Sequence, residues 1–436
     1  MSTRIVLAAF GSLGDIHPTM ALALELQRRG HEAIIATSEL YRAKIEAEGL
    51  GFHAMRPDLP PPRESHELIR RVADAKTGTE YLFAELLMPA LRDSYADLIP
   101  VARECDLLIS HPATCAAPLV AQSLKMKWLS LALAPISIWS VYDPPVLANL
   151  PALTRPQLLR KNVPVQRFFK STAQHVSRKW IAPVLKFRKE LGLPDTGHPL
   201  FRGQHSPFGV LALFSKVLAV PQTDWPANTH VCGACYYDKR GEFEGFDEEY
   251  SGARLLPEIQ SFLAAGEKPI VFTLGSSAVF DARDFYEQST RAARRINRRA
   301  LLLIGETENR PPSLPENNNQ IAAFEYAPYG ELFSQSAAIV HAGGAGTMAR
   351  VLESGAPSIV MPFGNDQFDN AARLELLEIG RTIARAQYSA PRVARELAAL
   401  LDDPIYTLRA SEIAHQVRTE NGARSAVDVI EKVLAQ

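Results

Sequence analysis

The sequence predicts an α/β protein made of two halves in which strands and helices alternate. Short apolar runs such as residues 4–10 and 337–340 are typical of buried parallel strands. Each run is followed by a loop of small residues and then by apolar residues at helical spacing, as in a βαβ unit. Because this series starts at residue 4 and again at residue 268, we expect two such halves with a cleft between them.

Length and composition restrict the class of protein. The chain has 436 residues, of which 47% are hydrophobic, so two or three domains can each bury a core. A net charge of −1 gives no reason to expect a nucleic-acid partner. Four cysteines do not form a disulfide framework, and no segment has the length of a membrane span, so we expect a cytoplasmic protein. Cys232 and Cys235 have the spacing of half a zinc site, but no second pair follows, so no metal is expected.

The N-terminal half begins with a complete βαβ unit. Residues 4–10 form the first predicted strand, residues 11–18 the loop after it, and residues 31–37 the second strand. Pro18 can occupy the first helical position, where its missing N–H costs nothing. We therefore expect a helix from Pro18 to about Arg29, ended by Gly30.

Asp15 is the first candidate for chemistry. It stands in the loop GSLGD at the start of that helix, where its charge would repel a pyrophosphate. The site therefore suits a group that loses a proton, with Gly14 letting a substrate come close and His17 nearby. Two plainer interpretations stay open. Asp15 can be an acid that caps the helix, and a lone His before Pro is more often a packing residue.

A later strand of the same half also ends in polar residues. Residues 105–110 are predicted to form a strand that ends at Ser110 and His111, and residues 127–133 to form another. Because carboxyl ends of parallel strands share one edge of a sheet, Ser110 and His111 can line the same cleft as Asp15.

Residues 155–189 are strongly basic. They contain ten Lys or Arg residues and no Asp or Glu, together with Phe168, Phe169, Trp180 and Ile181. One interpretation is a solvated helical face whose long side chains cover apolar surface. The other is an interfacial helix that makes peripheral contact with an anionic membrane.

The second half carries a signal for phosphate binding. After the strand at residues 337–340, His341 precedes a glycine-rich turn and a helix that Gly355 ends. A helix N-terminus offers unpaired N–H groups and a positive dipole end, which favour phosphate. The small residues after the strand at 268–274 repeat this arrangement with Ser276 and Ser277.

A neighbouring strand end adds polar groups of a different kind. The strand at residues 358–361 ends at Pro362, and Asp366 and Gln367 follow at its carboxyl end. A phosphate site beside an acid and an amide suits a molecule with phosphate at one end and hydroxyls at the other. A nucleotide-sugar is such a molecule.

These motifs resemble a known family. HAGGAGT followed by PFGNDQFDNAARL is similar to the donor-binding signature of family 1 glycosyltransferases, which have the GT-B fold of two Rossmann-like domains facing across a cleft. FGSLGDIHPTMALALEL resembles the branch with sterol glucosyltransferases, glycopeptide-antibiotic glycosyltransferases and the rhamnolipid rhamnosyltransferase. The resemblance covers nearly the whole chain. It implies an acceptor domain at 1–225, a nucleotide-sugar domain at 226–415 and a C-terminal helix at 416–436 that packs back on the first domain.

The resemblance also implies roles for single residues. Asp366 and Gln367 would bind the sugar hydroxyls, and Asp15 would be the catalytic base, with His111 as its partner. The nucleobase would lie against Tyr326 and Ala327. The remaining donor-binding residues, around the phosphates, would be Ser276, Ser277, His341, Gly343, Gly344, Ala345, Gly346 and Thr347.

The sequence therefore predicts an inverting glycosyltransferase that needs no cofactor or metal. Its donor would be a UDP- or dTDP-sugar, and the choice stays open because Ala349 stands where plant relatives have a ribose-binding Glu. Its acceptor would be a hydrophobic molecule with a hydroxyl, such as a phenol, sterol, macrocycle or hydroxy-fatty acid. The alternatives are a nucleotide-sugar epimerase or hydrolase of the same fold, and a nucleotide-sugar binding protein without catalysis.

Overall fold

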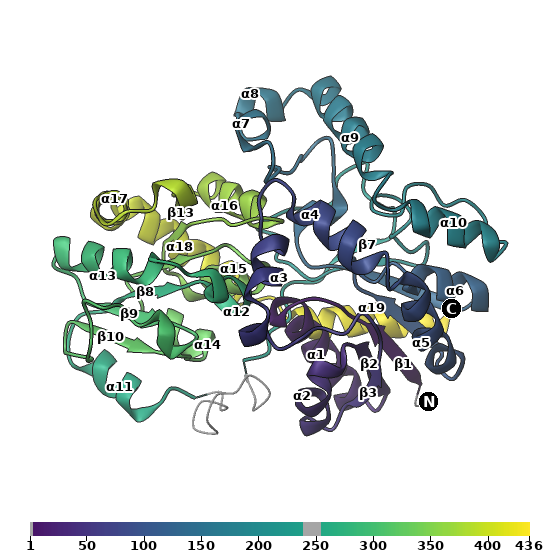
Figure 1. Ribbon diagram of the computed structural model, residues 1–436, viewed down its shortest axis with the longest axis horizontal. Helices are drawn as coiled ribbons and strands as arrows, with labels where there is room; N and C mark the ends of the chain where they lie inside the picture. Colours follow the sequence, from purple (N-terminus) through teal and green to yellow (C-terminus); the bar gives the residue numbers. More distant parts are fainter. Residues whose placement is uncertain (1–2, 239–253) are drawn as a thin grey trace. The chain divides into compact units, whose positions relative to one another are not determined.

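The chain forms two compact units, each built around a parallel sheet (Figure 1). The computed structural model describes residues 3–238 and 254–436. Unit 1 comprises Met1–Pro61, Lys76–Tyr237 and Glu420–Gln436, and unit 2 comprises Pro62–Ala75 and Asp238–Thr419. The expected boundary at residue 225 falls inside unit 1, because β7 (Thr229–Val231) pairs with β6 (Val210–Ala212).

Unit 1 contains a seven-stranded sheet in the order β3-β2-β1-β4-β5-β6-β7, with every pairing parallel. Its other strands are β1 (Arg4–Ala8), β2 (Glu32–Thr37), β3 (Gly51–Ala54), β4 (Leu107–Ser110) and β5 (Lys127–Ala132). Its helices are α1 (Leu13–Arg28), α2 (Arg42–Ala47), α4 (Gly78–Glu80), α5 (Leu91–Arg103), α6 (Ala117–Leu124), α7 (Pro151–Thr154), α8 (Gln157–Arg160), α9 (Val163–Ser177), α10 (Ala182–Glu190) and α19 (Gly422–Ala435).

Unit 2 contains a six-stranded parallel sheet in the order β10-β9-β8-β11-β12-β13. Its strands are β8 (Ile270–Thr273), β9 (Ala300–Leu303), β10 (Ile321–Phe324), β11 (Ala338–His341), β12 (Ser358–Val360) and β13 (Gly380–Thr382). Its helices are α3 (His66–Val72), α11 (Pro257–Ala264), α12 (Gly275–Ala278), α13 (Phe285–Arg295), α14 (Tyr329–Phe333), α15 (Ala345–Ser354), α16 (Gln367–Leu376), α17 (Ala390–Asp402) and α18 (Pro404–Val417).

Helices cover both faces of the unit 2 sheet. Successive residues of a strand point to opposite faces, so neighbouring residues of β8 belong to different cores. Ile270 and Phe272 of β8 belong to a core with α13 and α17. Val271, between them, belongs to a second core with α11, α14 and α15. This two-sided burial explains why the strands read as continuous apolar runs in the sequence.

Residues 62–75 leave the N-terminal half of the chain and pack in unit 2. Ile69 and Ala73 lie against the core that contains β8. Asn365 Nδ2 donates a hydrogen bond of 3.2 Å to the carbonyl of Val72. Gly364 lies so close to this segment that a Cβ there would be 2.6 Å from the Ala73 carbonyl oxygen.

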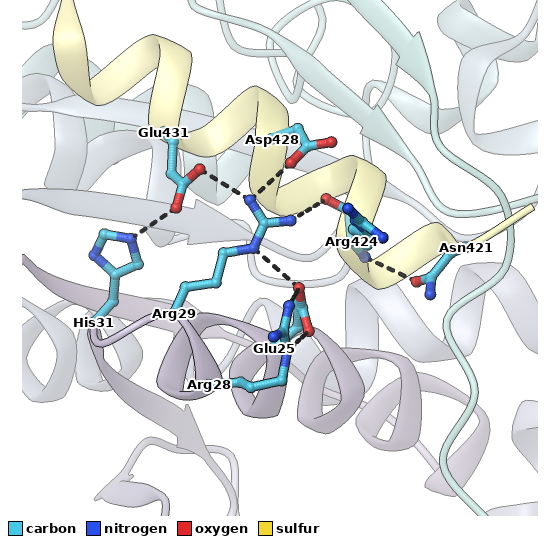
Figure 2. Close-up of polar contacts among 8 residues, drawn as sticks. All are labelled: Glu25, Arg28, Arg29, His31, Asn421, Arg424, Asp428 and Glu431. Atoms are coloured by element: carbon cyan, nitrogen blue, oxygen red, sulfur yellow. Dashed lines mark hydrogen bonds and ion pairs between the residues drawn. The ribbon is translucent and has the colours of Figure 1, made fainter.

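Helix α19 packs against α1 in unit 1, and Figure 2 shows the polar contacts between them. The guanidinium of Arg29 contacts Glu25 at 3.0 Å, Asp428 at 2.7 Å and Glu431 at 2.9 Å. Hydrogen bonding from Arg28, with a further contribution from Arg29 and against the effect of burial, lowers the pKa of Glu25 to about 2. These ion pairs join the last helix of the chain, α19, to the C-terminal end of the first, α1.

The first helix begins earlier than the sequence suggested. It starts at Leu13, so Pro18 lies inside it instead of at its first position. Ser12 is the N-cap, and its side chain accepts from Gly14 N–H while Asp15 bonds back to Ser12 N–H. This capping box satisfies the end of the helix five residues before the proline.

Candidate active site

Within each unit, the strand order brings predicted site residues to one edge of the sheet. In each sheet the order reverses direction beside the first strand, between β1 and β4 in unit 1 and between β8 and β11 in unit 2. Such switch points are where open α/β sheets bind ligands, at the carboxyl ends of the strands. Asp15 follows β1 and His111 follows β4, whereas Ser276 follows β8 and His341 ends β11. Each unit therefore carries candidate residues at its switch point.

Asp15 and His111 are in contact in unit 1. His111 Nε2 lies 3.3 Å from Asp15 Oδ1, and the His111 side chain is 7% exposed against 33% for Asp15. The other ring nitrogen, Nδ1, accepts from the backbone N–H of Ala113 at 3.2 Å. In the neutral ring the proton is thus on Nε2, the nitrogen that lies beside Asp15.

The second carboxylate oxygen of Asp15 has a structural role. Oδ2 accepts from the Ser12 N–H at 2.8 Å and from the Ser12 hydroxyl at 3.3 Å. Gly11 has φ +138°, and a Cβ there would lie 2.1 Å from Asp15 Oδ2. The capping interpretation therefore describes Oδ2 of Asp15, whereas Oδ1 lies beside His111 and a third of the side-chain surface is exposed.

His17 and Ser110, two other candidates in unit 1, have packing contacts in the structure. His17 packs edge to face against Tyr237, with ring centroids 4.9 Å apart, as expected for a packing histidine. Ser110 is 2% exposed, and its hydroxyl donates to the Leu129 carbonyl at 3.4 Å, so it faces the sheet. Gly14 lies in the first turn of α1 beside Asp15.

The glycine-rich turn in unit 2 connects β11 to α15. Gly344 is the N-cap of α15, and the helix runs from Ala345 to its left-handed end at Gly355. A Cβ on Gly344 or on Gly346 would meet nothing within 4 Å, so a ligand atom can approach the backbone there. Gly343 is different. It has φ +92°, and a Cβ would lie 2.7 Å from Val360 Cγ1. The turn is therefore packed on one side and open on the other.

His341 presents a buried donor beside this turn. Its side chain is fully buried, and its Nδ1 accepts from the Gly343 N–H at 3.1 Å. The neutral ring must then carry its proton on Nε2. Among the described residues, Nε2 has no hydrogen-bond partner. A buried donor without an acceptor is costly, and a phosphate oxygen would satisfy it.

Burial lowers the pKa of His341 to about 3, so the ring is neutral near pH 7. The unfolded chain, with an ordinary histidine pKa of about 6.5, takes up a proton that the folded chain refuses. The contribution of His341 to the unfolding free energy is therefore fully present above the unfolded pKa of about 6.5, and it is lost as the pH falls towards the folded pKa of about 3. We expect the unfolding free energy of the wild type, relative to His341→Gln, to fall by about 1 kcal/mol between about pH 7.5 and about pH 5.5. Urea titrations at both pH values measure it, and an unchanged difference would contradict it.

The other donor-site candidates surround the same strand ends. Ser276 and Ser277 lie in the short α12, and a Cβ on the preceding Gly275 would be 3.4 Å from Thr347 Oγ1 of α15. Tyr326 and Ala327 follow β10. The hydroxyl of Tyr326 donates to the Asp238 carbonyl at 2.6 Å.

Asp366 and Gln367 each use one side-chain oxygen in hydrogen bonds within the protein. Gln367 Oε1 accepts from the backbone N–H groups of Phe363 at 2.8 Å and of Gly364 at 3.4 Å, so a ligand at this position would meet the amide nitrogen. Asp366 Oδ2 accepts from Asn370 Nδ2 at 2.8 Å. Sequence reasoning assigned Asn370 no role. The signal that could have found it is a poor helix former one turn after Asp366.

Comparison with known proteins identifies the class. Residues 5–88 match the glycosyltransferase family 28 N-terminal domain, and residues 301–434 match the erythromycin biosynthesis protein CIII-like C-terminal domain. The O-mycaminosyltylonolide 6-deoxyallosyltransferase of Streptomyces fradiae is 30% identical over 98% of this chain and 97% of its own. A sterol 3-beta-glucosyltransferase of Neurospora crassa is 28% identical over 98% of this chain, which corresponds to 27% of that protein.

Solved structures agree on the fold. The glycotransferase of kitacinnamycin has a TM-score of 0.71 at 20% identity, with 99% of both chains covered. The glycosyltransferase VinC, in complex with dTDP, has a TM-score of 0.66 at 17% identity, again with 99% of both chains covered. The fold class is thus an α/β enzyme of the GT-B type, as predicted. The chain belongs to the glycosyltransferase family that includes the 6-deoxyallosyltransferase of Streptomyces fradiae, which confirms the resemblance.

Proposed function

We propose that this glycosyltransferase moves a sugar from a UDP- or dTDP-sugar to a hydroxyl of a hydrophobic acceptor, with inversion at the anomeric carbon. The observation that carries the proposal is the buried His341 Nε2–H, which has no acceptor among the described residues and lies beside an open glycine turn. This combination fits the diphosphate of a donor. The dTDP bound to VinC supports the same class of ligand.

Asp15 is the base of the proposed reaction. As the acceptor oxygen forms its bond to the anomeric carbon, Asp15 takes the hydroxyl proton, and the bond from that carbon to the phosphate oxygen breaks. The leaving diphosphate is stabilised by His341 and by the N–H groups that open α15. His111 holds the carboxylate of Asp15 in one orientation through the contact at 3.3 Å. Neither a metal nor a cofactor takes part.

The proposed acceptor class follows from the relatives. One is named for O-mycaminosyltylonolide and another for a sterol, and both names describe hydrophobic molecules with hydroxyl groups. Asp15 lies in unit 1, so we assign acceptor binding to that unit and the donor to unit 2.

Release of nucleotide with and without acceptor tests the proposal. The protein is incubated with UDP-glucose or dTDP-glucose and with a panel of phenols, sterols, macrocycles and hydroxy-fatty acids. We expect at least one acceptor to raise release of UDP or dTDP, with a glycosylated product seen by mass spectrometry. Release that is independent of acceptor would instead indicate a hydrolase, and binding without release would indicate a binding protein.

We further propose that unit 1 makes peripheral contact with anionic membranes through α7, α8 and α9, which form a run at the top of Figure 1. Large apolar side chains that are exposed gather here: Leu150 at 42%, Leu153 at 48%, Leu158 at 85%, Phe168 at 66% and Val176 at 46%. Of the four apolar residues singled out from the sequence, only Phe168 is exposed. Ile181 is fully buried, and Trp180 packs with it.

The charge of this surface supports an anionic partner. Three of its cations, Arg160, Lys170 and Lys179, are paired with acids from other segments. Lys161 and Arg167, in the same segment of the chain, are exposed. Apolar side chains that enter an interface beside cations are typical of peripheral membrane binding. Among the described residues, no helix combines the length and the apolar character needed to cross a membrane.

Vesicle sedimentation tests this contact. We expect the protein to sediment with phosphatidylcholine vesicles that contain phosphatidylglycerol, but only weakly with phosphatidylcholine alone. Phe168→Glu and Leu158→Glu should each lower the bound fraction severalfold, because a charge replaces an inserting side chain. Leu408→Glu, at a site in α18 that is 56% exposed, is the matched control and should bind like the wild type. Equal sedimentation of all four proteins would contradict the assignment.

A further inference from the structure

We infer that Asn370 is a positioning residue that joins the phosphate-binding and sugar-binding parts of the donor site. The inference rests on the proposed function of His341, the glycine turn and Asp366. Asn370 lies in the first half of α16, and its side chain is fully buried. It therefore has no contact with solvent and acts through its neighbours.

One amide group of Asn370 bridges two strand-end loops. Its Nδ2 donates to the carbonyl of Gly343 at 2.9 Å and to Asp366 Oδ2 at 2.8 Å. Gly343 belongs to the turn after β11, and Asp366 follows β12. Both partners can only accept in these contacts, so the amide must present its nitrogen to them, which determines its orientation. The position of the Asp366 carboxylate is thereby set relative to the glycine turn.

The geometry around Gly343 adds a second observation. The Gly343 N–H donates to His341 Nδ1, and the Gly343 carbonyl accepts from Asn370 Nδ2. The backbone of one residue is thus held from both sides by buried polar side chains. The outer atoms of both, His341 Nε2 and Asn370 Oδ1, are buried and have no hydrogen-bond partner among the described residues. Most buried polar groups in native structures have a partner, so two unsatisfied groups at one turn call for an explanation such as a bound ligand.

Loss of the Asn370 amide should therefore have two effects at once. The turn loses a bond that holds Gly343, so diphosphate binding weakens. The Asp366 carboxylate loses its fixed position, so the contribution of the sugar to binding is lost as well. Removal of Asp366 should affect the sugar alone. This difference separates Asn370 from a residue that only contacts the sugar.

Calorimetry with UDP, UDP-glucose, dTDP and dTDP-glucose tests the inference. For Asn370→Ala we expect affinity for the better nucleotide to fall about tenfold, the loss of one positioned hydrogen bond. We also expect the extra affinity for the sugar-bearing form to disappear. Asp366→Ala should lose that extra affinity while nucleotide binding stays within twofold of the wild type. The double variant should resemble Asn370→Ala. If neither glucose donor binds the wild type more tightly than its nucleotide does, the test is whether Asn370→Ala, but not Asp366→Ala, weakens binding of UDP or dTDP.

Asn370→Asp gives an independent readout should the alanine variant not fold. It keeps the shape but removes both donors and places a carboxyl group beside Asp366. Protonation of this carboxyl restores one donor, so nucleotide affinity of Asn370→Asp should rise as the pH falls from about 8 to about 5.5, relative to the wild type. A residue with a merely structural role would show no such rescue.

Asn317→Ala, at an exposed site, is the control for losing an amide that bonds to the backbone. Its amide also bonds to the backbone of unit 2, exchanging hydrogen bonds with Ala323, and its loss should leave nucleotide binding unchanged. A wild type that binds neither UDP nor dTDP would overturn the proposed function together with this inference. A wild type that binds, with Asn370→Ala and Asn370→Asp binding equally well at every pH, would overturn the inference alone.

Discussion

Replacement of Asp15 by Asn is expected to lower turnover by roughly 10²–10⁴, the usual cost of losing a general base. Asparagine keeps the shape of the side chain, and its remaining oxygen can still accept from the Ser12 N–H. It cannot take a proton from the acceptor hydroxyl. Affinity for the donor should change little, because the proposed donor residues belong to unit 2. Single-turnover assays with a productive acceptor measure the chemical step directly.

His17→Ala is the control for this experiment, because His17 stands two residues from Asp15 in the same helix. Its ring packs on Tyr237, so we expect a small effect on transfer. The opposite outcome, in which His17→Ala abolishes transfer and Asp15→Asn retains it, would assign the base to His17. It would also show that the similarity of this loop to the family was read two residues out of register.

Replacement of His341 by Ala is expected to weaken nucleotide diphosphate binding by about 1.5–3 kcal/mol, or roughly 10- to 150-fold. The reason is the loss of a buried donor that would bond to a charged phosphate. The effect does not depend on a charged imidazole, since burial keeps the ring neutral. Calorimetry with UDP and dTDP gives the affinities.

A half-buried histidine provides the control for truncation as such. His205 in unit 1 also has a ring nitrogen without a partner among the described residues, and burial together with Lys170 lowers its pKa to about 4. His205→Ala removes a similar ring from a place with no proposed ligand. Unchanged affinity in a folded His341→Ala protein, or an equal loss in both variants, would refute the assigned role.

The strands and loops at the centre of each sheet were predictable from the sequence. Their apolar runs are continuous because both faces are buried, and Gly355 ends α15 as expected. The strands β3, β6, β7 and β13 were not predicted. They have only three or four residues each, so local pattern carries little information, and pairing with a neighbour determines them. The early start of α1 depended on a capping box that the proline obscured.

The site was predictable as a set of positions but not as a set of bonds. Parallel strand ends bring Asp15 to His111 and the glycine turn to Asp366, and topology alone implies this. Sequence spacing does not reveal side-chain geometry. It therefore could not show that Asp15 Oδ2 caps the helix, or that Gln367 Oε1 accepts from the Phe363 N–H. Their catalytic and binding roles remain predictions. Asn370 was missed because its bond to Gly343 joins residues 27 positions apart, and its bond to Asp366, four positions away, does not by itself indicate that role.

The segments 62–75 and 420–436 have a practical consequence for hybrid enzymes. Exchanging the proposed donor-binding unit between two relatives by a single junction near Tyr237 would leave residues 62–75 of one parent to pack on strands of the other. The same exchange would place an unmatched α19 against α1, where Arg29 needs Asp428 and Glu431. A hybrid that respects the units needs junctions at 61/62, 75/76, 237/238 and 419/420. Unit 2 can then be exchanged as a whole without cutting through either core.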